Sequence, residues 1–190
     1  MAKTKHVAAL ALGAVAIGAG VYYASHHKPP APSPAASTAP ASPASGAAAQ
    51  CDPSLWTHVY KPERLIAQPQ GCISVTGTIA DATADEKRHR KDGVRHEADG
   101  DTHGWLTLDQ PYKTLLNAGN MTHQGGNLVF EIVCRFRVTQ PDAEGVCEGY
   151  TSPIQVPPIG SHVRITGTYV QDTNHGKWME IHPVSSIVLE

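Results

Sequence analysis

Acidic residues are missing from the first 50 positions, where few large apolar residues occur beyond one early run. All 17 aspartate and glutamate residues lie in residues 51–190, with 12 of the 15 lysine and arginine residues, so this part carries a net charge of −5 when histidine is neutral. Domains that depend on phosphate backbones usually carry a basic stripe. The acidic balance therefore does not favour nucleic acid as a partner, although residues 51–190 are numerous enough to bury a core.

Cysteine pairs of the CxxC type are also missing, which argues against a structural zinc site. The four cysteines are Cys51, Cys72, Cys134 and Cys147. An even number of cysteines in a protein outside the cytoplasm is typical of disulfides. Of the three possible pairings we predict Cys51–Cys72 and Cys134–Cys147, because each closes a short loop. In the chain-entropy model a loop of this size contributes about 3 kcal/mol.

An uncharged stretch from Val7 to Ser25 follows Lys3 and Lys5. About 18 residues in a helix rise ~27 Å, close to the ~30 Å of a bilayer core, and positive charge in front of such a helix favours a cytoplasmic N-terminus. We expect residues 1–28 to form an uncleaved signal anchor. A cleaved signal peptide is the alternative, with Gly18-Ala19-Gly20 as the best cleavage site. No cysteine follows closely, so a lipoprotein anchor is not expected.

Residues 29–50 are rich in proline, alanine and serine. Such a segment buries too little apolar surface to fold, and repeated proline makes it a semi-extended spacer. We therefore expect a disordered linker between the transmembrane segment and one extracytoplasmic domain, residues 51–190. The protein would be a single-pass membrane protein with its domain in the periplasm or at the cell surface, or a secreted protein if the signal is cleaved.

The domain reads as mainly β. Alternating apolar residues predict a strand over 73–79, with a glycine in its middle. Further strands are expected at 102–109, 127–134, 163–170 and from Lys177 onward, with Leu106, Leu108, Met179 and Ile181 facing inward. A short helix with Thr139 as its N-cap is expected after the third of these strands.

Two of these strands share a central glycine, in VTGT at 75–78 and ITGT at 165–168. Together with the closing segment KWMEIHPVSSIVLE they resemble an OB-fold, whose first and fourth strands often carry a glycine where the barrel bends. The resemblance implies a small five-stranded Greek-key barrel with one short helix. VRHEADGDTHGWLTLD, NLVFEIVC and TQPDAEGVCEGY are also similar to a family of small exported bacterial and archaeal proteins without an assigned activity. That similarity covers about 55–190 and implies the barrel but no mechanism.

The hairpin around Asp99-Gly100 holds the main candidate site. A two-residue turn of this type pairs residues whose numbers sum to 199. It predicts that His96 lies opposite His103, with an exposed Trp105 on the same outer face. Cross-strand partners have Cβ atoms ~5 Å apart, so the two imidazoles could share a divalent metal, zinc or copper.

Other residues near the hairpin extend or weaken this hypothesis. Asp101 or His89 would supply a further metal ligand. Arg88 and Arg90 belong to a basic run, KRHRK at 87–91, that would add an anion contact, unless it is only a solvated charge run. In the alternative without a site, the loops 82–92 or 111–127 cover Trp105 and make it ordinary packing.

The last strand carries Glu180 and His182 on its outer face, beside Trp178. In an OB topology this strand lies about two strand spacings, ~10 Å, from the second strand. That separation argues against a single site shared with His96 and His103.

The segment DGDT at 99–102 resembles the same four residues of staphylococcal-type nucleases, which are also OB-folds. The arginine-rich strand and the Ile-Asp-x-Pro-Glu segment of those enzymes are missing, so phosphodiester attack would lack its charge clamp and base. No serine or cysteine stands in a context typical of a nucleophile, and no catalytic residue is assigned.

The sequence thus predicts a membrane-tethered, extracytoplasmic OB-like binding or adaptor module for an unidentified small ligand or protein partner. Its expected ligand surface consists of Trp105, His96, His103, Arg88 and Arg90. The first alternative is a divalent-metal-binding protein that uses His96 and His103. A metal-dependent phosphodiesterase or nuclease is a less favoured alternative.

Overall fold

The computed structural model describes residues 50–84 and 90–190, so the predicted anchor, nearly all of the linker, and Arg88 and His89 lie outside the described residues. Its strands are β1 (Leu65–Ala80), β2 (Arg95–His96), β3 (Thr102–Leu108), β4 (Leu128–Ile132), β5 (His162–Asp172) and β6 (Met179–Leu189). Its helices are α1 (Ala118–His123) and the short 3₁₀ helices η1 (Pro53–His58), η2 (Pro62–Arg64), η3 (Gln110–Leu115) and η4 (Pro141–Cys147). In this part of the chain no helix is long and apolar enough to cross a membrane.

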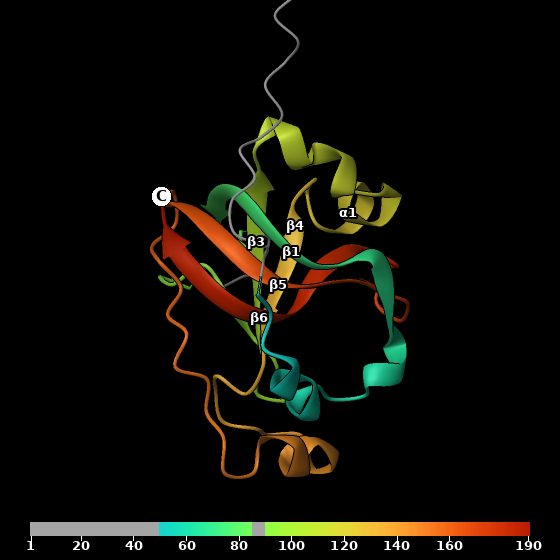
Figure 1. Ribbon diagram of the computed structural model, residues 1–190. Helices are drawn as coiled ribbons and strands as arrows, with labels where there is room; N and C mark the ends of the chain where they lie inside the picture. Colours follow the sequence, from blue (N-terminus) through green and yellow to red (C-terminus); the bar gives the residue numbers. More distant parts are fainter. Residues whose placement is uncertain (1–49, 85–89) are drawn as a thin grey trace, which may run out of the picture. The chain divides into compact units, whose positions relative to one another are not determined.

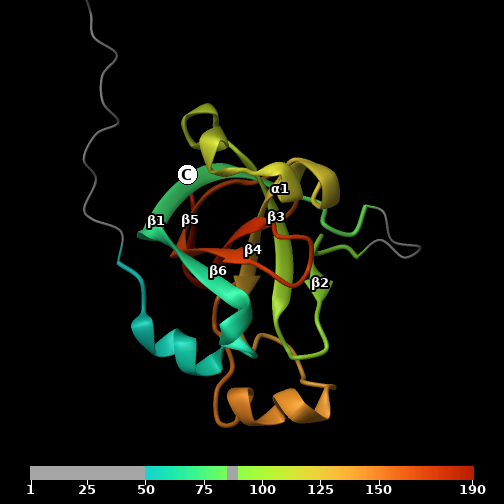
Figure 2. The same ribbon diagram turned by 90° about the vertical axis from the view of Figure 1, so that its right-hand side faces the viewer.

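The six strands form one mixed sheet that closes on itself (Figures 1 and 2). The order is β1-β5-β6-β4-β3-β2, and β1 also pairs with β3 to complete the ring. β4 and β6 run parallel, whereas the other neighbours are antiparallel. The prediction of a mainly β domain with ring-like closure is therefore confirmed. The strand beyond the predicted five is the two-residue β2, which lies at the edge beside β3 (Figure 2).

The two predicted central glycines lie where neighbouring strands approach closely. A Cβ atom on Gly77 would lie 2.4 Å from the backbone oxygen of Thr107, across the β1–β3 pairing that closes the ring. A Cβ atom on Gly167 would lie 2.4 Å from Cγ2 of Ile181. The β5–β6 register also shifts on both sides of Gly167. At both positions a larger residue would push neighbouring strands apart.

The interior of the ring is apolar. The four residues predicted to face inward, Leu106, Leu108, Met179 and Ile181, are all buried in its core. The ring of Phe130 on β4 fills the space beside Gly104 on β3. Each fully buried aliphatic or aromatic side chain contributes about 1.5–3 kcal/mol of transfer free energy, so this interior is the main source of stability.

Two disulfides attach peripheral segments to the ring. Cys51 is bonded to Cys72 of β1 with an S–S distance of 2.08 Å, and Cys134, just after β4, to Cys147 of η4 at 2.00 Å. Both pairs are those predicted, and no cysteine is free. Two disulfides fit an oxidising compartment outside the cytoplasm. η1 and η4 lie at one end of the ring and α1 at the other (Figures 1 and 2).

The short helix after β4 differs in detail from the prediction. It is the 3₁₀ helix η4, and its N-cap residue is Gln140 rather than Thr139. Thr139 does not cap it because both its backbone N–H and its hydroxyl donate to the carbonyl of Ala98 in the hairpin loop. The contact between these distant segments could not be inferred from the local capping pattern.

The loop of the β2–β3 hairpin has three residues, 98–100, instead of the predicted two. The N–H of Glu97 donates to the carbonyl of Asp101, and the N–H of Gly100 donates to the carbonyl of Glu97. Gly100 takes a positive φ of 97°. Three-residue hairpin loops with a glycine of positive φ at the end are the next most common class after two-residue loops. The longer loop shifts the pairing of the two strands by one residue.

Candidate functional site

The one-residue shift separates the two histidines of the predicted site. His103 pairs with Arg95, whereas His96 pairs with Thr102. Because a shift of one residue turns a side chain to the other face of a strand pair, His96 and His103 point to opposite faces. The prediction that they face each other is wrong, and the structure does not bring them together as ligands of one ion.

His96 lies on the solvent side of the hairpin. Its imidazole stacks on the ring of Phe136 with the centroids 3.4 Å apart. Nε2 is 2.9 Å from a carboxylate oxygen of Asp92, and Nδ1 is 3.0 Å from the guanidinium of Arg90. Arg90 therefore lies beside His96 on the solvent side of the hairpin and does not contribute to the face that carries His103 and Trp105.

Trp105 is buried, contrary to the prediction of an exposed ring. Only 9% of its surface is accessible. Its indole Nε1–H donates to the side-chain oxygen of Gln124 at 2.6 Å. The guanidinium of Arg95 lies over its ring, 5.3 Å from the centroid. It packs with Ala82, Val129 and Trp178. The predicted alternative, in which loops cover this tryptophan, is what the structure shows.

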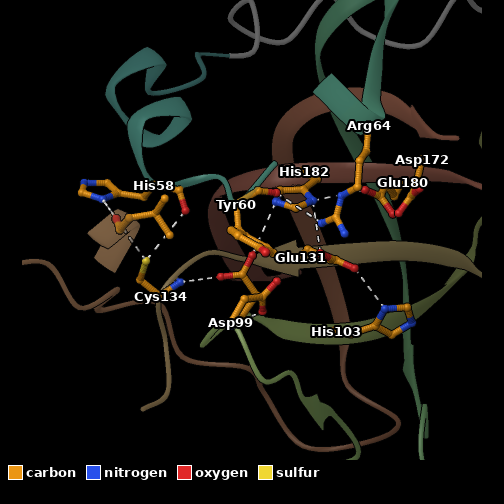
Figure 3. Close-up of polar contacts among 12 residues, drawn as sticks. His58, Tyr60, Arg64, Asp99, His103, Glu131, Cys134, Asp172, Glu180 and His182 are labelled. Atoms are coloured by element: carbon orange, nitrogen blue, oxygen red, sulfur yellow. Dashed lines mark hydrogen bonds and ion pairs between the residues drawn. The ribbon is translucent and has the colours of Figure 1, made fainter. Parts of the chain in front are cut away.

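A row of polar side chains crosses the outer face of the ring from β3 over β4 to β6 (Figure 3). His103 Nδ1 lies 3.1 Å from one carboxylate oxygen of Glu131, whose other oxygen lies 3.1 Å from Nδ1 of His182. Glu180 also approaches this Nδ1 at 3.1 Å, and its second oxygen accepts the indole N–H of Trp178 at 2.7 Å. We call His103, Glu131, His182 and Glu180 the outer polar row.

Asp101, just before β3, lies next to His182 of this row. Its Oδ1 accepts the backbone N–H of Cys134 at 2.8 Å, and its Oδ2 lies 3.6 Å from Nε2 of His182. Both side chains are almost completely buried, at 2% and 3% exposed. Among the described residues neither Oδ2 of Asp101 nor Nε2 of His182 has a hydrogen-bond partner. Asp101, Glu131 and His182 offer ligand atoms that all lie within 4.8 Å of one another.

Burial changes the proton affinity of these groups. Desolvation raises the pKa of Asp101 and of Glu131 well above their usual range, because a buried carboxylate loses its hydration. For Glu180 the same effect, increased by the nearby Asp172 charge, raises the pKa to about 7. Burial also lowers the pKa of His103, which favours its neutral form. The carboxyl groups of Asp101, Glu131 and Glu180 therefore lie in a buried environment that disfavours their charged form.

A pocket of about 390 Å³ lies beside the outer polar row, and His103 and Glu131 form part of its wall. Tyr60 and Trp178 contribute aromatic surface. The other charged residues of its wall come from separate segments of the chain and have both signs. They are Lys61, Arg64 and Arg95, and Glu97, Asp99 and Asp172.

Glu131 and Gln124 were not predicted from the sequence as residues of the site. Glu131 is the single charged residue of the run NLVFEIVC, which is otherwise apolar or uncharged. A charge in a buried strand must be paired or coordinated, so this residue was a detectable signal. As predicted, the last strand does not pair with the hairpin, because β4 separates β6 from β3. Glu131 bridges that separation, and the gap therefore does not exclude a shared site.

No protein family, curated protein or solved structure matches the chain at a significant level of similarity. The function has to be inferred from the geometry of the pocket and of the outer polar row.

Proposed function

We propose that the chain is a membrane-tethered, extracytoplasmic binding module on an OB-like barrel, and that its pocket binds a small ligand that carries both a positive and a negative charge. Amino acids and short peptides are the ligand class that fits this description. The presence of side chains of both signs around one pocket of about 390 Å³ is the observation that carries the proposal.

The order of strand pairing supports the OB-like barrel. Among the five long strands, the first pairs with the second and the fourth, and the third pairs in parallel with the fifth. Antiparallel neighbours complete the ring, and η4 lies between the third and fourth of these strands in the sequence. A partly open five-stranded Greek-key barrel that binds ligands on an outer face is the OB-fold arrangement.

The size and wall of the pocket support a small polar ligand. Ligand pockets usually measure about 300–1,000 Å³ and orient their ligand with a few placed polar groups. Arg64 is such a group, because its buried Nε has no hydrogen-bond partner among the described residues. Its Nη2 donates to the carbonyl of Tyr60 at 3.2 Å, which fixes the guanidinium beside the pocket. A guanidinium has five N–H donors, so a ligand carboxylate in the pocket would accept from donors other than the one bonded to Tyr60.

Carboxylates on other parts of the wall favour a cationic group on the same ligand. Glu97 and Asp99 come from the hairpin, and Asp172 from the end of β5. An ammonium group near these side chains and a carboxylate near Arg64 would both be paired. A ligand with charge of only one sign would meet side chains of its own sign in the same pocket.

The proposed location rests on the two disulfides, which form and persist in oxidising compartments. The anchor itself rests on the sequence pattern of residues 1–28, with residues 29–50 as spacer. Extraction of membranes tests this part: the full chain should stay in the membrane fraction, and an N-terminus at Val21 or later would show a cleaved signal instead.

Binding can be tested with three probes of different charge: glycylglycine, spermidine and citrate. We expect glycylglycine to shift the amide resonances of the pocket wall and the other two to bind at least tenfold more weakly. Arg64→Gln should weaken glycylglycine binding at least tenfold. Arg137→Gln, which changes an exposed arginine outside the pocket, is the matched control and should bind normally.

Preferential binding of citrate or of spermidine would contradict a ligand with both charges. Equal losses in the Arg64 and Arg137 variants would show a non-specific charge effect. If none of the three probes shifts the pocket resonances, the pocket does not serve this ligand class.

No separate metal function is proposed for the hairpin, because His96 and His103 point to opposite faces. The phosphodiesterase alternative gains no support from the described contacts of DGDT. Within that segment Asp101 is buried and bonded to the backbone of Cys134, where it does not face the pocket.

A further inference from the structure

The pair formed by Asp101 and His182 leaves two buried polar atoms without a hydrogen-bond partner in the part of the chain that the structure describes. Oδ2 of Asp101 and Nε2 of His182 face each other at 3.6 Å, too far for a hydrogen bond. A buried polar atom without a partner costs about 1–3 kcal/mol. Most such atoms in native proteins are paired, and each exception calls for a cause such as an ion.

We propose that Asp101, His182 and Glu131 bind one divalent transition-metal ion, for which Zn²⁺ is the best match. Zn²⁺ binds imidazole nitrogen and carboxylate oxygen at ~2.0–2.2 Å with tetrahedral geometry. Two ligand atoms on such an ion lie roughly 3.3–3.5 Å apart. The 3.6 Å between Oδ2 and Nε2 is therefore close to the separation that a shared zinc ion requires.

The neighbours of these two side chains hold them in the orientation that a metal ion needs. The N–H of Cys134 occupies Oδ1 of Asp101 and leaves Oδ2 available. At the other ring nitrogen, Nδ1 of His182 lies 3.1 Å from Glu180. A carboxylate that accepts the Nδ1 proton fixes the tautomer with a free Nε2, and metal-binding histidines usually donate their other ring N–H in this way.

Glu131 completes the set of ligands. Both Glu131 and Glu180 lie 3.1 Å from the same Nδ1 of His182, although this nitrogen has only one proton to donate. When Glu180 accepts it, Glu131 needs no proton from His182, and the ligand atom that Glu131 offers lies within 4.8 Å of those of Asp101 and His182. One carboxylate oxygen of Glu131 remains 3.1 Å from His103, which positions the carboxylate.

The charge balance of the cluster also favours a cation. Two carboxylates and a neutral imidazole around a divalent ion form a group with no net charge. Without the ion, burial works against ionisation of these carboxylates, because isolated charges in a buried site are strongly destabilising. A bound cation compensates both charges and so offsets that penalty.

The ion has a route to the site, since the side chain of Glu131 is 15% exposed and lines the pocket. The ligand set also selects the type of ion. Calcium takes six to eight oxygen ligands and magnesium keeps several waters, whereas an imidazole with two carboxylates suits zinc and related transition metals. This site does not depend on the pocket ligand, and its test is separate.

The experiment uses the full chain after treatment with a chelator. Zn²⁺ titration by calorimetry should give one ion per chain, and saturating Zn²⁺ should raise the melting temperature of the protein. Ca²⁺ at the same concentration should have no such effect. Asp101→Asn and His182→Gln should each lower the affinity for Zn²⁺ at least tenfold, while His162→Gln should not.

His162→Gln is a matched control because this histidine also pairs with a carboxylate, that of Asp109, but stands at the opposite end of β5 from Asp172 and is exposed. Asp101→Asn keeps an oxygen that can accept the N–H of Cys134, so the variant should fold. If it does not, the Co²⁺ form of the unaltered chain decides: its absorption spectrum should indicate tetrahedral nitrogen and oxygen ligands.

Four results would overturn the proposal. The first is that neither Zn²⁺ nor Co²⁺ binds to the chelator-treated chain. In the second, Asp101→Asn and His182→Gln bind Zn²⁺ as tightly as the unaltered chain. In the third, His162→Gln loses affinity to the same extent, which would place the ion on surface histidines. A Co²⁺ spectrum with octahedral features only would also contradict the predicted ligand set.

Discussion

The two faces of β3, β4 and β6 are both buried, but they carry opposite kinds of side chain, apolar on the inner face and polar on the outer face. The inner face carries Leu106, Phe130 and Ile181, none of which has accessible surface. The outer face of the same three strands carries the outer polar row, in which Glu180 is as fully buried as Phe130. Burial alone therefore does not distinguish the core of this domain from its candidate site.

The difference lies in what covers each face. The inner face is covered by the other strands of the ring, whose alternating pattern already indicates a core. The outer face is covered by segments distant in sequence: Tyr60 and Arg64 before β1, Gln124 after α1, and Trp178 before β6. A sheet whose two faces are both buried needs such a second layer over its outer face.

The two faces also differ in how contacts stabilise them. Apolar contacts inside the ring are non-directional and scale with the area removed from water. Each polar group of the outer layer needs a partner, since an unpaired one costs about 1–3 kcal/mol. Substitutions on the inner face should therefore affect stability most, and those on the outer face should depend on whether a partner is left unpaired.

The largest effect is expected from the inner face. Phe130→Ala should destabilise the domain by about 3–5 kcal/mol, because the lost ring leaves a cavity beside Gly104 that the sheet cannot close. Urea unfolding followed by tryptophan fluorescence measures this change. Val188→Ala, on the half-exposed end of β6, is the control and should change stability by less than about 0.5 kcal/mol. A loss below about 1.5 kcal/mol for Phe130→Ala would mean that the ring interior is not the main core.

Much of the inner face follows from the sequence. The alternation at 73–79 and the inward positions Leu106 and Ile181 were predicted, as were both disulfides. These features depend on local periodicity and on short loops. The two-residue length of β2 did not follow from the sequence, because it depends on which residues before the hairpin loop pair with β3, and only Arg95 and His96 do.

The outer face was predicted less well for two physical reasons. The register of the hairpin depends on whether its loop has two or three residues, and Asp99-Gly100 is compatible with both. The second reason is that Gln124 reaches Trp105 from a segment whose helix was not predicted. Glu131 alone carried a local signal, as a charge within an apolar run.

An intermediate effect is expected where a buried outer group loses its partner. Gln124→Met keeps the volume of the side chain but removes the acceptor of the Trp105 N–H, so stability should fall by about 1–3 kcal/mol. Trp105→Phe removes the donor instead. In that background Gln124→Met should cost at least about 1 kcal/mol less, and a double-mutant cycle from urea unfolding measures the difference. Additive losses would show that this hydrogen bond does not stabilise the outer layer.

The smallest effect is expected at the solvent side of the hairpin, where His96 differs most clearly from His103. His96→Ala removes a partly exposed pair with Asp92 and a stacking contact with Phe136, which together should cost about 1 kcal/mol. His103→Ala should cost about 2 kcal/mol or more, because it leaves one carboxylate oxygen of Glu131 without its imidazole partner in a buried place. Urea unfolding compares the two variants, and near-ultraviolet circular dichroism checks that both remain folded.

His96→Ala should also leave the affinity for Zn²⁺ unchanged, since its ring lies on the face away from Asp101 and His182. Equal losses of stability in the two variants, or a loss of Zn²⁺ affinity in His96→Ala, would contradict the shifted register and restore the two histidines to one site.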